Sequence, residues 1–311
     1  MSTPAESLRP ELVTPTLLRN WPLPGGGSSK EDRGSVLVIG GARKTPGAAL
    51  LAGLAALRAG AGRLTLGVAE SAAIQLAIAL PESGVVGLAE TPAGSVRGDG
   101  AGALAGTLQK AAAVLVGPGL DNEEEAATLV RELLRLEAEV NGPEEDDGGA
   151  SEGEGAPPPT FVLDAYALGC LPPMVEELRA WAGRLILTPN TKEAGILLGR
   201  DVKDLTSDVA EIAAKFQAVV TCQGVIASPD ARLWEITTGY GGLGTSGSGD
   251  VLAGAIAGLK ARGIAPTQAA CWGTHLHAAA GDRLASRLGS LGYLARELAD
   301  ELPPLMMELD T

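Results

Sequence analysis

Short apolar segments alternate with helical segments between residues 36 and 221. Each apolar segment is rich in Val, Leu and Ile and ends near Gly, Pro, Asp or Asn, which is typical of buried strands in a parallel sheet. The predicted strands are 36–39, 64–68, 113–116, 161–163, 185–188 and 218–221, and the predicted helices between them are 48–58, 123–139, 175–182 and 207–216. This order predicts an α/β fold: a doubly wound, mostly parallel sheet between two layers of helices, with ligands at the carboxyl ends of the strands.

The rest of the chain fits one domain. Residues 225–236 predict a hairpin that turns at Pro229-Asp230 and forms an antiparallel edge of the sheet. The predicted domain is 34–305, after an N-terminal extension (1–33) and before a tail (306–311), and three further helices are predicted at 250–262, 266–288 and 292–301. Residues 141–159 are acidic and contain almost no apolar side chains, so they predict a disordered insertion between a helix and a strand.

Composition excludes several classes of function. The net charge of −14 would repel nucleic acid and anionic membranes, so neither is an expected partner. No segment resembles a signal peptide or a membrane span. Cys170, Cys222 and Cys271 are odd in number and show no close pair, which predicts neither a disulfide framework nor a zinc site and favours the reducing cytoplasm.

The chain contains two histidines, His275 and His277. Histidine is a common metal ligand and a common base for activating nucleophiles. They lie two positions apart on a predicted helix and therefore point in different directions. We expect them to pack on the helix surface or at an interface rather than to bind a metal or form a triad.

Residues 244–250, Gly-Thr-Ser-Gly-Ser-Gly-Asp, precede an apolar helix. A glycine-rich turn at a helix N-terminus directs unpaired amides at one point and attracts phosphate, so Gly247, Ser248 and Gly249 are candidates for an anion hole. Asp250 would repel a bound polyphosphate unless it faces a metal or a proton-bearing second substrate. The segment therefore predicts phosphoryl transfer to a hydroxyl with Asp250 as the base. The alternative is a simple helix cap with closely packed glycines.

Polar and glycine-rich residues also follow several predicted strands. They are Gly40-Gly41, Gly117-Pro118-Gly119, Asp164, Thr188-Pro189-Asn190 and the segment 239–250. Each has a plain structural alternative as a turn or a cap, and Asn190 with Glu193 has the form of a capping box. Together they predict one cleft built from five separated segments.

These motifs resemble those of the ADP/ATP-dependent NAD(P)H-hydrate dehydratases, a branch of the ribokinase-like superfamily. The resemblance extends from about residue 34 to residue 305. It rests on Ser246-Gly-Ser-Gly-Asp-Val-Leu-Ala-Gly254, the catalytic signature, and on segments 46–62, 80–82, 116–119, 162–168 and 187–193. It implies a ribokinase-like domain without a lid, and the assembly typical of the family, a homotetramer.

The resemblance also implies a reaction. A nucleotide, ADP or ATP with Mg²⁺, phosphorylates the hydroxyl of a hydrated NADH or NADPH ring, and phosphate then leaves to restore the reduced cofactor. By the family pattern the hydrate pocket is lined by Ala48, Gly119 and Asn190, next to Asp250. The same pattern assigns the donor nucleotide to Gln223, Gly224, Val225, Ile226, Ala227 and Gly249. The residue types themselves suggest Glu193 as a metal ligand, with Mg²⁺ offsetting charge between Asp250, Glu193 and the polyphosphate.

The chain departs from the family pattern at three positions. Asn190 stands where bacterial members often have His, Gln223 where Lys is usual, and Tyr240 where the family has Asn. The Gln223 amide lacks the cation that would bind a nucleotide phosphate. The epimerase domain that many bacterial members carry is absent, so the epimerase is expected to be a separate protein. Two alternatives stay open: a small-molecule kinase of the same superfamily, acting on a vitamin precursor or sugar, and a non-catalytic nucleotide sensor.

Overall fold

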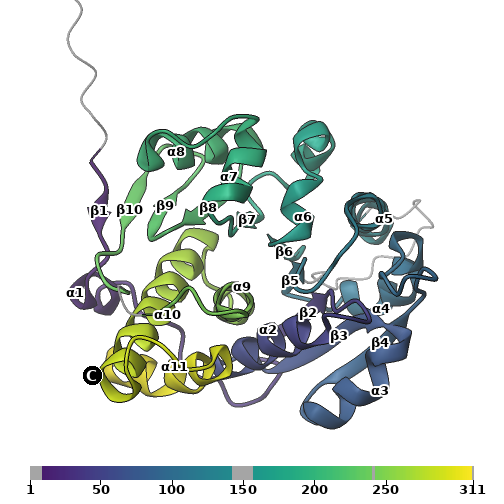
Figure 1. Ribbon diagram of the computed structural model, residues 1–311, viewed down its shortest axis with the longest axis horizontal. Coiled ribbons are helices and arrows are strands. Elements are labelled where there is room, and N and C mark those ends of the chain that lie inside the picture. Colours follow the sequence, from purple (N-terminus) through teal and green to yellow (C-terminus); the bar gives the residue numbers. More distant parts are fainter. Residues whose placement is uncertain (1–8, 142–156, 240–241, 310–311) are drawn as a thin grey trace, which may run out of the picture.

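A ten-stranded sheet forms the centre of the molecule in the computed structural model, which describes residues 9–141, 157–239 and 242–309 (Figure 1). The strand order is β1-β10-β9-β8-β7-β6-β5-β2-β3-β4, and neighbours run parallel except in the two pairs that contain β9. The strands are β1 (Glu11–Leu12), β2 (Ser35–Ile39), β3 (Arg63–Ala69), β4 (Gly84–Leu88), β5 (Ala113–Val116), β6 (Thr160–Leu163), β7 (Leu185–Leu187), β8 (Val219–Cys222), β9 (Val225–Ala227) and β10 (Leu233–Glu235).

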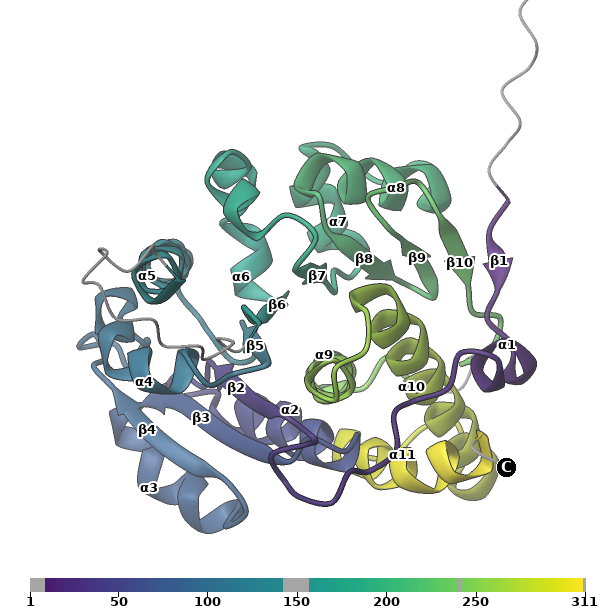
Figure 2. The ribbon, with the colours of Figure 1, turned by 180° about the vertical axis from the view of Figure 1, so that it is seen from behind.

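Helices cover both faces of this sheet, so the predicted doubly wound α/β class is confirmed (Figures 1 and 2). One apolar core contains α2 (Pro46–Arg58), α3 (Glu70–Ala79), α9 (Ser248–Ala261), α10 (Pro266–Leu288) and α11 (Ala295–Leu309), with α1 (Pro15–Arg19) beside it. The other contains α4 (Ala105–Leu108), α5 (Glu123–Asn141), α6 (Tyr166–Gly169), α7 (Thr191–Leu198) and α8 (Leu205–Phe216). Short 3₁₀ turns lie at Gly98–Leu104, Pro172–Met174 and Glu177–Trp181.

Small residues allow α2 and α9 to pack backbone against backbone. A Cβ atom added at Gly254 would lie 2.1 Å from the carbonyl oxygen of Ala52, and one added at Gly258 would lie 2.3 Å from that of Ala56. The two helices are among the most tightly associated in the fold, and α9 is buried along most of its length. Because Asp250 lies in the first turn of α9, this contact fixes the position of its carboxylate.

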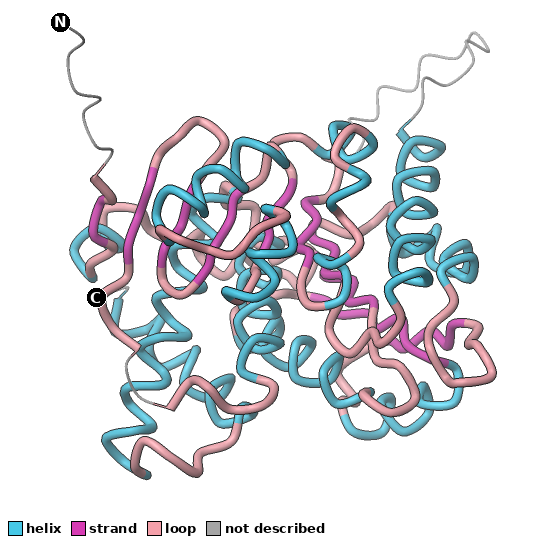
Figure 3. The backbone as a smooth tube through the Cα atoms, turned by 45° about the horizontal axis from the view of Figure 1, so that its top comes forward, coloured by secondary structure: helices cyan, strands magenta, loops and turns pink. Residues whose placement is uncertain are grey.

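The strands that carry the site are buried because their sequences are apolar on both faces. All four residues of β5 and of β6 are inaccessible or nearly so, as expected for central strands of a parallel sheet covered by helices. Figure 3 shows the strands of the sheet together with the loops that leave their ends. The carboxyl ends of β2, β5, β6 and β7 meet at one edge, which brings the predicted motifs together.

Several predicted elements differ from the structure. Residues 225–236 form the hairpin β9–β10, but β1 pairs with the outer side of β10, so the hairpin is not the edge of the sheet. Residues 175–182 contain only a 3₁₀ turn, after the pair Pro172-Pro173, rather than an α-helix. The sequence prediction omitted β4, whose two glycines and short length hide its strand pattern, and omitted α3.

The terminal segments belong to the packed structure where they are described. The side chains of Gln268 and Trp272 donate hydrogen bonds of 2.9 and 2.8 Å to the carbonyl of Trp21, so the segment after α1 is held against α10. Residues 306–309, predicted as a tail, continue α11. Of the predicted insertion at 141–159, residues 142–156 lie outside the described residues. Among the helices that are described, none has the length and apolarity needed to cross a membrane.

Candidate active site

Asp164 lies at the centre of the edge where the carboxyl ends of the strands meet. It directly follows β6, is 6% exposed, and its Oδ1 atom accepts a hydrogen bond of 2.8 Å from the hydroxyl of Thr188, the residue after β7. Adjacent parallel strands thus supply the acid and its hydrogen-bond donor. The family-based assignment did not include either residue, although the position of Asp164 after a buried strand had marked it for the cleft.

Three carboxylates lie close enough to influence one another. Burial, together with the negative charges of Asp250 and Glu193, raises the pKa of Asp164 to about 7. Burial also raises the pKa of Asp250 to about 6 and raises that of Glu193. The structure therefore brings Asp164, Glu193 and Asp250 into one acidic site, although they come from three separated segments.

The raised pKa of Asp164 predicts how stability depends on pH. Between the unfolded value of 3.8 and the folded value of about 7, the folded protein binds more protons than the unfolded chain, so the free energy of unfolding falls as pH rises through that range. Each pKa unit corresponds to about 1.4 kcal/mol. We expect wild type to lose a few kcal/mol relative to Asp164→Asn between pH 4 and pH 7, measured by denaturant unfolding. Equal pH dependence in the two proteins would contradict this protonation.

The glycine-rich segment ends in the first turn of α9. Gly247 is the N-cap with φ of +88°, a conformation that glycine adopts without strain. The N–H of Ser248 donates to the carbonyl of Thr245 (3.2 Å) and that of Val251 to the carbonyl of Gly247 (3.1 Å). Helix geometry leaves the amides of Gly249 and Asp250 without an intrahelical acceptor. These two amides, rather than that of Ser248, are therefore available to an anion.

Ser248 is instead held by His277 of α10. Its hydroxyl lies 2.9 Å and its carbonyl oxygen 3.0 Å from Nε2 of the imidazole, and both residues are buried. Burial lowers the pKa of His277 to about 4, so the ring is neutral at physiological pH. The predicted surface position of His275 and His277 is wrong, because each is only 7% exposed.

The residues predicted to line the hydrate pocket, Ala48 and Gly119, lie side by side. A Cβ atom added at Gly119 would lie 3.0 Å from that of Ala48 and 2.3 Å from the carbonyl oxygen of Thr45, and φ of Gly119 is +74°. The Thr45 hydroxyl donates a hydrogen bond of 2.7 Å to the carbonyl of Gly119. Any larger side chain at position 119 would displace the loop that begins α2.

Asn190 and Glu193 form a capping box at the N-terminus of α7. The Asn190 side chain accepts from the amides of Lys192 (2.9 Å) and Glu193 (3.0 Å), while a Glu193 carboxylate oxygen accepts from the amide of Asn190 (2.9 Å). The structural alternative noted from the sequence is thus present. It does not remove Glu193 from the site, because the charge of Glu193 acts on Asp164.

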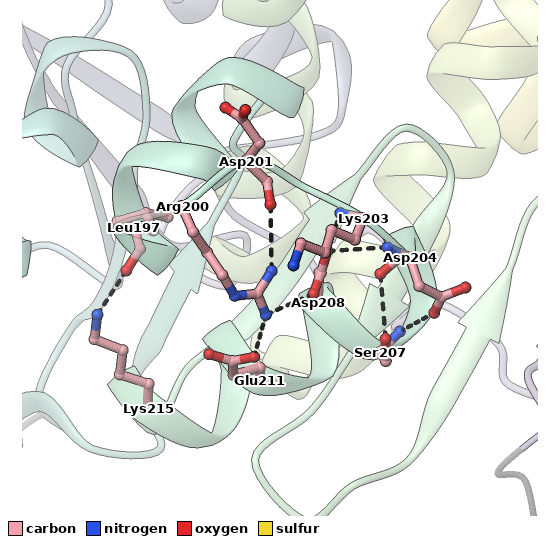
Figure 4. A network of polar contacts seen from close by, with 9 residues as sticks. All are labelled: Leu197, Arg200, Asp201, Lys203, Asp204, Ser207, Asp208, Glu211 and Lys215. Atoms are coloured by element: carbon pink, nitrogen blue, oxygen red, sulfur yellow. Dashed lines mark hydrogen bonds and ion pairs between the residues drawn. The ribbon is translucent and has the colours of Figure 1, made fainter.

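A network of polar contacts anchors α7 against α8 (Figure 4). Arg200 binds the carboxylates of Asp208 (2.8 Å) and Glu211, and the ammonium group of Lys215 donates a hydrogen bond of 2.6 Å to the carbonyl of Leu197. Asp208 is nearly inaccessible and also accepts a backbone hydrogen bond from Lys203. These contacts lie at the C-terminal end of α7 and fix the helix whose N-terminus carries Asn190 and Glu193.

A magnesium ion is compatible with this site. No group of three or more His, Cys, Asp or Glu side chains that could hold a metal occurs in the part of the chain that the structure describes. Mg²⁺ commonly takes one or two protein carboxylates and completes its shell with water and substrate phosphates. One or two of the carboxylates near Asp164 would fit such a shared site, in which the nucleotide supplies the remaining oxygens.

The residues predicted for the donor nucleotide fall into two groups. Gln223 and Gly224 form the tight turn between β8 and β9, both with positive φ, and Gln223 is exposed. Val225, Ile226 and Ala227 form β9 between two neighbouring strands, and their side chains are buried. The exposed turn is therefore the part of this segment that a ligand can reach.

Asp282 on α10 is a further polar residue that the sequence prediction omitted. Its carboxylate accepts a hydrogen bond of 2.8 Å from the amide of Gly239. Helix α10 thus holds the segment between β10 and α9 at both ends, through Asp282 at Gly239 and through His277 at Ser248. The contacts span 43 and 29 residues, so no local sequence pattern could have revealed them.

The cavity of about 490 Å³ at the other end of the sheet is not this site. It lies at the amino ends of β2 and β3 and is lined by Lys30, Arg63 and Lys110 among others. Ligands of open parallel sheets bind at the opposite, carboxyl ends. The convergence of carboxylates, not the size of the cavity, therefore locates the candidate active site.

Comparisons with known proteins agree with this geometry. A family model described as NAD(P)H-hydrate dehydratase matches residues 36–304. An ADP-dependent (S)-NAD(P)H-hydrate dehydratase from Xanthomonas campestris is 42% identical over 97% of this chain and 98% of its own length. A bifunctional NAD(P)H-hydrate repair enzyme from Moorella thermoacetica is 37% identical over 89% of this chain and 50% of its own.

A solved structure gives the same result. The ADP/ATP-dependent NAD(P)H-hydrate dehydratase of Bacillus subtilis, co-crystallised with ATP and Mg²⁺, superposes with a TM-score of 0.76 at 27% identity and covers 97% of this chain and 100% of that one. Apart from β1, the family match spans the sheet, and it includes the carboxylate site and the glycine-rich segment. The chain belongs to the NAD(P)H-hydrate dehydratase family.

Proposed function

We propose that this protein converts hydrated NADH and NADPH back to NADH and NADPH at the expense of ADP or ATP, and is thus a carbon–oxygen lyase of metabolite repair. The observation that carries the proposal is Asp250, a half-buried carboxylate in the first turn of α9 beside free backbone amides. Relatives named ADP-dependent support the nucleotide requirement, and the complex with ATP and Mg²⁺ supports the metal.

The residues of the site have separate roles in this reaction. The ring hydroxyl of the hydrate gives its proton to Asp250 and attacks the terminal phosphorus of the nucleotide, whose bond to the rest of the nucleotide breaks to release AMP from ADP or ADP from ATP. The amides of Gly249 and Asp250 donate hydrogen bonds to the transferred phosphoryl group, where charge develops. The ring nitrogen then supplies electrons as the C–O bond breaks, and phosphate leaves with the former hydroxyl oxygen. The adjacent ring carbon loses a proton, which restores the ring double bond of the reduced cofactor.

The pKa of Asp250, raised to about 6, suits the first step. A base with a pKa near the working pH is mostly ionised yet still binds a proton well. Bound Mg²⁺ would offset the negative charge of the polyphosphate, with Glu193 as its protein ligand. Asp164 is placed to retain a proton beside these groups, which limits the negative charge that the nucleotide meets.

The hydrate and the nucleotide occupy opposite sides of Asp250 in this proposal. Ala48, Gly119 and Asn190 contact the hydrate in this proposal, which is supported by the packing of Ala48 beside Gly119 and by the place of Asn190 at the N-terminus of α7. Gln223 and Gly224 of the β8–β9 turn contact the nucleotide, together with Gly249. The buried residues Val225, Ile226 and Ala227 support that turn through the sheet.

A direct assay tests the proposal. Purified protein is incubated with hydrated NADH or NADPH, Mg²⁺ and either ADP or ATP, and the absorbance of the reduced nicotinamide is followed. We expect the absorbance to return only with nucleotide present. A stable phosphate ester without return of absorbance would instead establish the small-molecule kinase, and the absence of any turnover would establish a nucleotide sensor.

The substitution Gln223→Lys tests the nucleotide side of the site. A cation near the nucleotide phosphates should tighten ADP and ATP binding by about 1 kcal/mol, since the pair is partly solvated. The gain should decrease as salt rises and should be nearly absent for the hydrate. Calorimetric titration measures it; unchanged or weaker nucleotide binding would mean that residue 223 does not face the phosphates.

The proposed reaction also suggests where the protein acts, with which other enzyme and in which assembly. We propose a cytoplasmic enzyme, because its substrates are metabolites and its three cysteines are buried free thiols. A separate epimerase would interconvert the two epimers of the hydrate, and a homotetramer, as in the family, is the proposed assembly. Size-exclusion chromatography with light scattering tests the assembly.

A further inference from the structure

We infer that His277 is a positioning residue, which uses one imidazole N–H to hold both oxygens of Ser248 and so fixes the phosphate-binding turn of α9. The inference rests on the proposed function for its catalytic consequence and on geometry alone for the contact itself. Neither the family match nor the sequence motifs assign a role to this histidine.

The two distances at His277 select its tautomer. Nε2 lies 3.0 Å from the carbonyl oxygen of Ser248, which can only accept a hydrogen bond, and 2.9 Å from the hydroxyl oxygen of the same residue. If Nε2 carried no proton, its lone pair would face the lone pairs of the carbonyl oxygen. The neutral ring therefore carries its proton on Nε2 and shares it between the two oxygens.

The contact with His277 also determines the direction of the Ser248 hydroxyl proton. Because its hydroxyl oxygen accepts from His277, the Ser248 O–H proton points elsewhere and stays available as a donor. A change in the backbone orientation of Ser248 would break both of its contacts with His277, the one at the hydroxyl and the one at the carbonyl oxygen. Ser248 is 4% exposed and lies directly before Gly249 and Asp250, whose amides have no intrahelical acceptor and would donate to a bound phosphoryl group. The direction of those amides thus depends on a residue of a different helix.

The neighbouring histidine provides a matched control. His275 lies on the same helix with the same 7% exposure, and its Nδ1 atom has no hydrogen-bond partner among the described residues. Substitution of His275 removes the same kind of buried ring without touching the phosphate-binding turn. A loss of activity that comes only from destabilising α10 would appear in both sets of variants.

The contact itself is tested by NMR of the full-length enzyme labelled with ¹⁵N-histidine. The chain contains only two histidines, so His275→Gln assigns both sets of signals. We expect protonated-type shifts at Nε2 and unprotonated-type shifts at Nδ1 of His277 at neutral pH. The opposite tautomer, or averaging between the two, would overturn the inference, and this readout does not depend on which reaction the enzyme performs.

The positioning role is tested by kinetics on three variants. In His277→Gln the side-chain amide nitrogen can replace Nε2, whereas Asn is too short and Ala has no donor. We expect Ala and Asn to lower kcat by about 10- to 100-fold, with the KM for nucleotide within about threefold, and Gln to recover most of kcat. His275→Gln should keep the wild-type kcat. Wild-type kcat in His277→Ala, or a Gln variant no better than Ala at equal melting temperature, would overturn the role.

The pairing with Ser248 is tested in a double-mutant cycle. In a Ser248→Ala background one of the two acceptors is gone, so His277→Ala should cost less than it does in the wild-type background. Strictly additive losses would show that the two residues act independently. A wild-type enzyme that shows the expected tautomer yet does not restore the reduced nicotinamide would refute the proposed function and leave the contact intact.

Discussion

Asp250→Asn is expected to lower turnover by about 10²–10⁴-fold, the usual range for loss of a general base. The amide keeps the size of the carboxylate and most of its hydrogen bonding but accepts no proton from the ring hydroxyl. The carboxylate lies in the first turn of α9, next to amides that donate to an anion, so nucleotide binding should remain nearly unchanged.

Initial rates with hydrated NADH measure this loss, and calorimetry with ADP and Mg²⁺ measures nucleotide binding on the same preparation. Near-normal turnover in the variant would exclude Asp250 as the base. Weaker nucleotide binding of the same size as the loss in rate would instead assign the carboxylate to the donor site.

Gly254→Ala is expected to destabilise the protein by about 3 kcal/mol, at the upper end for overpacking. The added Cβ would lie 2.1 Å from the carbonyl oxygen of Ala52, and the obstacle is backbone rather than a flexible side chain, so α2 or α9 must move. Denaturant unfolding measures the loss. Gly106→Ala in α4 is the control, because nothing lies within 4 Å of its added Cβ and helix propensity favours Ala.

The Gly254→Ala variant also tests whether activity depends on the close packing of α2 and α9. A shift of α9 moves Asp250 and the adjacent amides, and small misplacements at a reacting centre are costly. We therefore expect Gly254→Ala to lose activity per folded molecule as well as stability, whereas Gly106→Ala keeps both. Full stability and activity in Gly254→Ala would mean that the close approach of α2 and α9 is not required.

The sequence predicted the parts of the fold that depend on local patterns. Continuous apolar runs such as 113–116 identified the central strands, and the glycine-rich turn before Asp250 identified the start of α9. Parallel topology then required these carboxyl ends to meet, which correctly placed Asp164 with Asp250. The family resemblance supplied the reaction, which no composition or spacing could have given.

Other features depend on contacts that are distant in sequence. Strand β1 has only two residues and is stabilised by pairing with β10. It therefore contains no apolar run from which the sequence could predict it. The buried state of His277 follows from its contact with Ser248, 29 residues away, and a spacing of two on a helix could not reveal it. The raised pKa of Asp164 likewise arises from burial and from charges on α7 and α9.

In the proposed reaction the ring hydroxyl is phosphorylated before it leaves. The most direct test uses hydrated NADH whose ring hydroxyl carries ¹⁸O, incubated with the enzyme, Mg²⁺ and ADP or ATP, followed by mass spectrometry of the released phosphate. If the hydroxyl oxygen attacks phosphorus and the C–O bond then breaks, one ¹⁸O atom should appear in inorganic phosphate for each NADH restored. Appearance of the label in water, with unlabelled phosphate, would show that the hydroxyl leaves without being phosphorylated.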